Sequence, residues 1–94
     1  MHTIQMKTIC GEHCTDVAKL EGLLDGLDKI RDGEDTLRLS FLEVKSLTPS
    51  CGSSIILQIR KMKGKRPGMV VQFTDLTTNV SRILNACLSN GVKV

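Results

Sequence analysis

The chain has 94 residues, which is enough for about one domain with a modest hydrophobic core, so we expect residues 1–94 to form a single domain. A hydrophobic fraction of 40%, a charged fraction of 24% and a net charge of +3 are typical of a soluble globular protein. Trp and Tyr are absent and Phe occurs only twice. This composition argues against nucleic-acid binding by base stacking, because such modules need aromatic platforms.

The chain has no apolar run of the length that a secretory signal or a membrane span requires. We therefore expect a cytoplasmic protein with no membrane span. In a domain this small, function is expected on surface loops or in a shallow groove rather than in a deep cavity.

The first half of the chain predicts a strand, a helix and a second strand. Loose alternation over residues 3–10 favours a strand that ends at Gly11. Thr15 is the expected cap of an amphipathic helix that continues to about Ile30. Alternating apolar residues over 37–41 then predict the second strand.

The second half repeats this order. After the loop 45–52, residues 53–62 fit a helix by length, although their β-branched residues favour a strand. Gly64 and Pro67 interrupt the chain, and 69–73 has the composition of a buried strand. Thr77 or Thr78 is expected to cap a last helix ending near Gly91, and 92–94 suits a final short strand.

This alternation predicts the α/β class, with a small, mostly parallel sheet and alternating helices. In such a sheet, the loop between a strand and its helix lies at the carboxyl edge, where ligands and partners bind. The segment 46–56 is that kind of loop, and it is the most informative part of the sequence. Ser50 is expected to cap the helix, and Gly52 is expected to let another backbone approach.

Other features give weaker indications. A phosphate-binding loop, a dinucleotide fingerprint and a cysteine-phosphatase spacing are all absent, so we expect no catalytic residues and no cofactor. Cys10, His13 and Cys14 supply three potential zinc ligands but lack a downstream pair, so free thiols are favoured over a metal site. The basic run 60–66 is interpreted as a solvated helix end, with a phosphate-binding patch as the alternative.

Five segments, taken in order, resemble the STAS family of anti-sigma factor antagonists. They are the stretch 47–52, the apolar run 55–57, the charged turn 63–65, the strand 69–71 and the helix 80–84. The opening 48–50 is also similar to small STAS-like proteins of unknown function from bacteria and phages. The resemblance covers about residues 36–90. It implies a STAS-like fold and a regulatory module that binds a protein, either a kinase-like protein or another regulator.

The resemblance also implies which residues would contact that partner: Thr48, Pro49, Ser50, Cys51, Gly52, Ser53 and Ser54. Cys51 stands where regulatory members carry a phosphorylated Ser or Thr, so Ser50 and Ser53 become the phosphorylation candidates. The alternative function is a small-ligand or phosphate-binding module that uses the same helix start. At that position we also expect Cys51 to be accessible and reactive, and Cys87 to be shielded.

Overall fold

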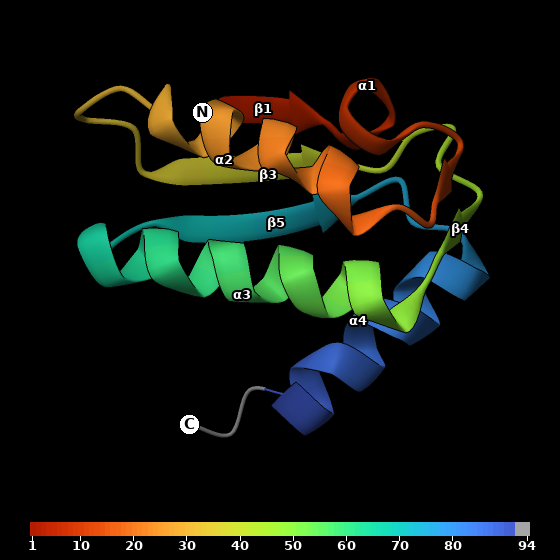
Figure 1. Ribbon diagram of the computed structural model, residues 1–94. Helices are drawn as coiled ribbons and strands as arrows, with labels where there is room; N and C mark the ends of the chain where they lie inside the picture. The colour runs from red at the N-terminus through yellow and green to blue at the C-terminus, as the bar shows by residue number, and fades with distance from the viewer. Residues whose placement is uncertain (92–94) are drawn as a thin grey trace.

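The computed structural model describes residues 1–91, with side chains placed through Leu88. It contains a three-stranded parallel sheet, a separate two-stranded pair and helices on one side of the larger sheet (Figure 1). In chain order the elements are β1 (His2–Gln5), α1 (Met6–Cys10), β2 (His13–Cys14), the 3₁₀ helix η1 (Val17–Leu20), α2 (Glu21–Asp28), β3 (Thr36–Ser40), β4 (Ser46–Leu47), α3 (Pro49–Lys65), β5 (Val70–Thr74) and α4 (Thr78–Gly91).

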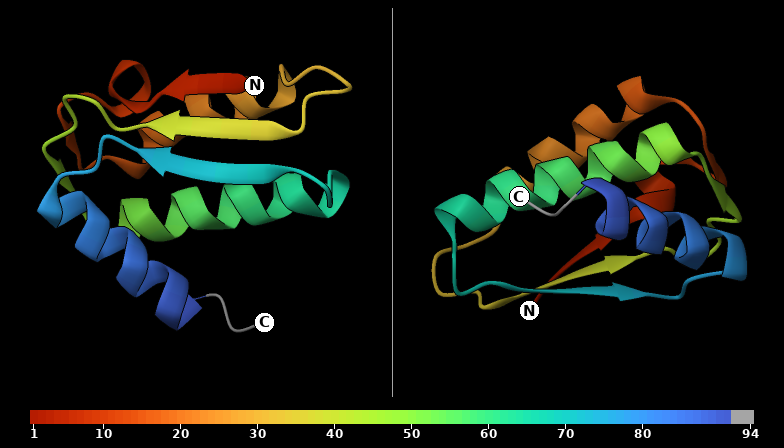
Figure 2. Two further views of the ribbon diagram at one scale, coloured as in Figure 1. Left: turned by 180° about the vertical axis from the view of Figure 1, so that it is seen from behind. Right: turned by 90° about the horizontal axis from the view of Figure 1, so that it is seen from below.

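The larger sheet has the order β1-β3-β5, and every pairing in it is parallel. The predicted α/β class with a mostly parallel sheet is therefore confirmed. Helices α2, α3 and α4 all lie on the same face of this sheet (Figure 2). The short strands β2 and β4 form their own parallel pair, which the sequence did not predict. No helix within residues 1–91 is long and apolar enough to cross a membrane.

Several predicted boundaries were wrong. The strand expected over 3–10 stops at Gln5, and the chain turns into α1, which buries Met6 and Cys10 on one side at helical spacing. The helix expected from Thr15 begins at Val17 as a 3₁₀ turn, and Asp16, not Thr15, accepts the capping hydrogen bond from Ala18. The strand proposed for 92–94 lies outside the described residues.

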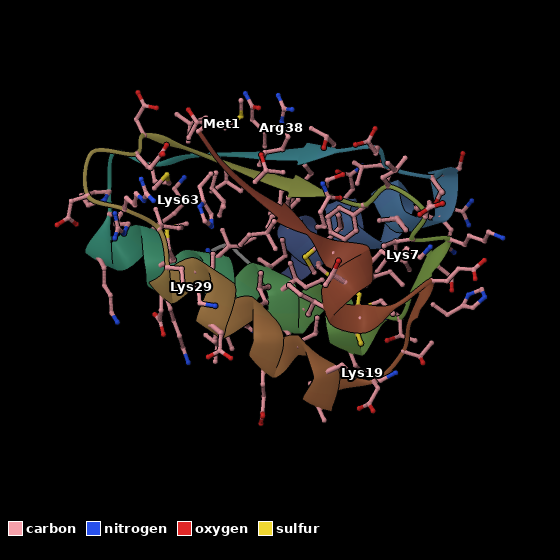
Figure 3. All side chains as sticks on the ribbon, turned by 90° about the horizontal axis from the view of Figure 1, so that it is seen from above. Met1, Lys7, Lys19, Lys29, Arg38 and Lys63 are labelled. Carbon is pink, nitrogen blue, oxygen red and sulfur yellow. The ribbon has the colours of Figure 1, made fainter. Side chains whose placement is uncertain are left out.

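The core lies between the sheet and the helices. From the sheet it takes Ile4, Leu37 and Leu39, each buried. The opposite face of the sheet is polar: Thr3, Arg38 and Gln72 share one register position across the three strands. Figure 3 shows Arg38 on the side of the sheet away from the helices. The sheet is thus covered by helices on one face only.

Helix α3 is longer than predicted, because packing outweighs the β-branched residues that weaken its helix propensity. Ile55, Ile59 and Met62 recur at helical spacing and are all buried. The start of α3 contacts α4 so closely that a β-carbon on Gly52 would lie 2.9 Å from Cys87 Sγ and 3.0 Å from Ile83 Cγ2. Gly52 therefore sets the distance between the two helices.

Replacing Gly52 tests this contact. We expect Gly52→Ala to lower the free energy of unfolding by about 1–3 kcal/mol, because the added methyl group overpacks the α3–α4 contact. Gly64→Ala is the matched control on the same helix, where an added β-carbon meets no atom within 4 Å. That variant should be more stable than the wild type by up to about 1 kcal/mol. Urea denaturation of both variants measures the difference, and equal effects would contradict the close contact.

Candidate functional site at the carboxyl edge of the sheet

The loops that follow β3 and β5, together with the first turns of α3 and α4, gather at the carboxyl edge of the parallel sheet (Figures 1 and 2). This is the edge at which open α/β sheets bind their ligands. The segment 46–56 lies here, as the sequence predicted from the strand-helix order. Its immediate neighbours are β2, which the sequence did not predict, and the start of α4 at Thr78, which the sequence predicted as a helix start but not as a neighbour of this segment.

Two hydrogen bonds hold the loops after β3 and β5 together. Ser40 Oγ donates to Asp75 Oδ2 at 3.0 Å, and the backbone N–H of Phe41 donates to Thr74 O at 2.9 Å. Each loop also contains a left-handed residue that is not glycine, with φ of 65° at Glu43 and 59° at Asp75. Such conformations persist where the surrounding contacts determine them, so this edge is a constrained structure.

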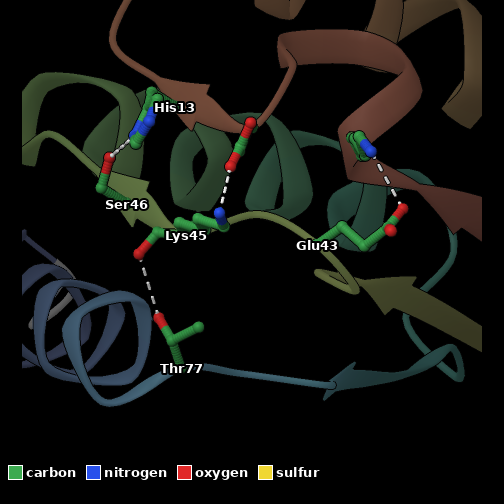
Figure 4. Close-up of polar contacts among 7 residues, drawn as sticks. His13, Glu43, Lys45, Ser46 and Thr77 are labelled. Atoms are coloured by element: carbon green, nitrogen blue, oxygen red, sulfur yellow. Dashed lines mark hydrogen bonds and ion pairs between the residues drawn. The ribbon is translucent and has the colours of Figure 1, made fainter.

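Exposed polar contacts connect the β2–β4 pair to the neighbouring elements (Figure 4). His13 Nδ1 lies 2.7 Å from Ser46 Oγ, and Thr77 Oγ1 donates to the carbonyl of Lys45 at 3.3 Å. Lys45 pairs with Glu12, and this hydrogen bond lowers the pKa of Glu12 and raises the pKa of Lys45. These groups are exposed, so the contacts orient the surface and add little stability.

The residues predicted to contact a partner differ in how far they are buried. Pro49, Ser50 and Ser53 are exposed. Ser54 is half-buried, and its hydroxyl accepts a hydrogen bond from Gln58 at 3.3 Å. Cys51 and Gly52 are buried against α4 and the core, so the expectation that they face a partner was wrong. The small residues there serve the packing of helix on helix.

The cap of α3 also differs from the prediction. Thr48, not Ser50, is the N-cap residue, and its Oγ1 accepts a hydrogen bond from the N–H of Cys51 at 3.3 Å. Pro49 occupies the first helical position, where its missing N–H costs nothing. The cap therefore lies two residues earlier than predicted, and in the helix that follows Cys51 is buried and Ser50 is exposed.

Two exposed leucines at this edge were not among the predicted contacts. Leu42 is 56% exposed in the turn after β3, and Leu76 is 37% exposed in the loop after β5. Leu42 had a visible signal, since it interrupts the alternation of the strand before it. Leu76 had none, because a single leucine in a polar loop is common in sequences.

The start of α3 offers few donors to an anion. Pro49 has no N–H, that of Cys51 bonds to the Thr48 side chain, and that of Gly52 donates to Thr48 O at 2.9 Å. Ser50 therefore supplies at most one N–H to a ligand. Part of the basic run is also structural, because Arg66 donates to the carbonyls of Ile30 and Arg31 after α2. Both observations count against the phosphate-binding alternative.

The four cysteines are free and all are buried. Cys14 is hydrogen-bonded to Cys10, which lowers the pKa of Cys10 and, with burial, raises the pKa of Cys14 well above its ordinary value. His13 is exposed on β2, whereas Cys14 beside it is buried. No group of three or more His, Cys, Asp or Glu residues is arranged to hold a metal ion in the part of the chain that the structure describes.

Neither a family model, nor a curated protein, nor a solved structure matches this chain.

The cap can be tested by two alanine substitutions. Thr48→Ala removes the acceptor for the Cys51 N–H and should lower the free energy of unfolding by about 1 kcal/mol. Ser50→Ala, two residues later and exposed, should change it by less than about 0.5 kcal/mol. Urea denaturation distinguishes the two positions. A larger loss at Ser50 than at Thr48 would show that the helix begins where the sequence first suggested.

Thiol labelling tests the burial of Cys51. Because the side chain has 0% exposure, we expect Cys51 in the folded protein to react with a thiol reagent far more slowly than in the urea-unfolded chain. Cys87, at 8% exposure, should be labelled first. Mass spectrometry of the peptides at successive times gives the order. Rapid labelling of Cys51 in the folded protein would contradict this packing.

Proposed function

We propose that this chain is a non-enzymatic, STAS-like regulatory module that binds a protein partner through the carboxyl edge of its sheet. The observation that carries the proposal is the surface formed there: Leu42 and Leu76 are exposed in the loops after adjacent strands, at the same edge as exposed Pro49 and Ser50. Exposed apolar side chains with a polar rim are typical of docking surfaces. We call these four residues the edge surface.

The geometry of the edge surface favours a macromolecule over a small ligand. Leu42 and Leu76 stand on loops held by hydrogen bonds, and Pro49 and Ser50 stand on the first turn of α3, so a partner could bind without first ordering them. The ordered run of motifs over 47–84 supports the finer assignment to a STAS-like module. Kinase-like proteins and other regulators are the partners that this resemblance implies.

Phosphorylation is the proposed control of this surface. Ser50 and Ser53 are exposed on the first turns of α3 and are accessible to a modifying enzyme. A phosphate there would add about −1.5 to −2 charge near the positive end of the helix dipole, so the fold would tolerate it. Covering the same charge with a partner would cost free energy, because the phosphate would lose its water, and docking would weaken.

A photo-crosslinking residue tests the edge surface directly. We place it at Ser50, and in a control variant at Asp32, which is fully exposed in the loop before β3 at the opposite end of the sheet. In extracts of the native cells, the Ser50 variant should crosslink to a discrete protein that the Asp32 variant does not capture. Equal crosslinking from both positions, or from Asp32 alone, would contradict docking at this edge.

Charge substitutions then test the control. With the crosslinked protein as ligand, Ser50→Asp and Ser53→Asp should each weaken binding at least tenfold, an effect of about 1.4 kcal/mol. The thermal midpoint should stay the same or rise slightly, because an acidic residue suits the first turn of a helix. Calorimetric titration and thermal unfolding measure the two quantities. Unchanged affinity in both variants would contradict control by phosphorylation.

A further inference from the structure

The outer edge of β5 has no paired strand among residues 1–91. The N–H of Val70 donates to Asp35 O, and Thr74 O accepts from Phe41, so both residues bond towards β3. Successive residues of a strand direct their backbone groups to alternate sides. The N–H and C=O groups of Val71 and Phe73 therefore point to the open edge, where they can pair with another strand.

A groove runs beside this edge. It is lined by Ile56, Ile59, Arg60, Lys63, Val71, Phe73 and Leu88. Its floor is apolar, and the half-buried side chains of Val71 and Phe73 pack against the core within it. Figures 1 and 2 show α3 and α4 lying beyond β5, so that the helix layer is wider than the sheet beneath it. A strand added to β5 would be covered by these two helices.

The overhang of α3 and α4 decides what kind of strand fits. In a dimer of this chain, the two β5 strands could pair only if the copies were related by a twofold axis perpendicular to the sheet. That arrangement places both helix layers on the same face of the joined sheet. The α3 and α4 of each copy would then occupy the space beyond the other's β5, and the helices would collide. The groove instead suits an extended segment that brings no helix of its own.

Charge adds a further constraint. The groove lining contains two cations and no acidic residue. Helix α3 runs back along the sheet from the end of β4 towards the start of β5, so Lys63 lies near the beginning of that strand. Lys63 is exposed, and its charge can attract a carboxylate on an incoming chain.

We propose that the open edge of β5 and this groove bind an extended segment of a partner protein by strand addition. The segment would carry apolar side chains at alternate positions, facing α3 and α4, and an acidic residue near Lys63. Its backbone would pair with the N–H and C=O groups of Val71 and Phe73. This β5 groove is separate from the edge surface, so the inference does not rest on the proposed function.

The test uses the whole chain and a displayed library of random twelve-residue peptides. Peptides selected on the wild-type chain should be enriched in alternating apolar residues with Asp or Glu at one end. The best peptide is then synthesised, and its affinity is measured by fluorescence anisotropy. Lys63→Glu should weaken binding at least tenfold, whereas Lys29→Glu, an exposed control beyond the end of α2, should leave it unchanged.

A second arm tests strand pairing without altering the protein. N-methylation of alternate backbone amides in the peptide removes their donors on one side only. Methylation of the set of amides that faces β5 should abolish binding, and methylation of the set that faces away from β5 should be tolerated. Hydrogen exchange at the amides of Val71 and Phe73 should slow at least tenfold when the unmodified peptide is bound.

Three results would overturn the inference. The first is a library that yields no peptide bound at the β5 groove. The second is a peptide whose affinity survives methylation of either set of amides, because it would bind without strand pairing. The third is a concentration-dependent dimer in analytical ultracentrifugation that slows exchange at Val71 and Phe73, since the occupant would then be a second copy.

Discussion

The close packing of the start of α3 against α4 is the contact on which the rest of this structure depends. Gly52 allows it, because any larger side chain would meet Cys87 and Ile83. The rotation of the helix follows, since a helix that turns Gly52 towards α4 places residue 50, two positions earlier, on its opposite side. Ser50 reaches the surface for this reason and Cys51 is held in the core, while the exposed Ser53 keeps its Oγ 3.6 Å from Cys87 Sγ.

The same packing sets the width of the helix layer. Among residues 1–91, three helices cover one face of a three-stranded sheet, and α4 extends past β5. The polar residues on the other face, Arg38 among them, keep that face in water. The result is an α/β domain with an apolar groove at one side and an edge surface at the end, and both are products of how the layers are offset.

At the carboxyl edge, partly buried hydrogen bonds rather than ion pairs fix the geometry of the loops. Its ion pairs are exposed, and pairs of this kind contribute little to the free energy of folding. The loop geometry comes instead from partly buried groups: the hydroxyl of Ser40, the carboxylate of Asp75 and the backbone of Phe41. These contacts hold Glu43 and Asp75 in left-handed conformations and so determine where Leu42 and Leu76 stand.

The sequence by itself determined the order of the main elements and the parallel sheet. Periodicity carries that information, since apolar residues repeat at helical spacing in α4 and alternate in β3. It also located the segment 46–56 at the carboxyl edge, because that follows from topology alone. Only the tertiary structure decided that Thr48 caps α3, that Cys51 is buried and that β5 has an open edge. Cap position, helix rotation and strand neighbours depend on contacts between residues far apart in the chain, such as Gly52 with Cys87, and local patterns do not encode them.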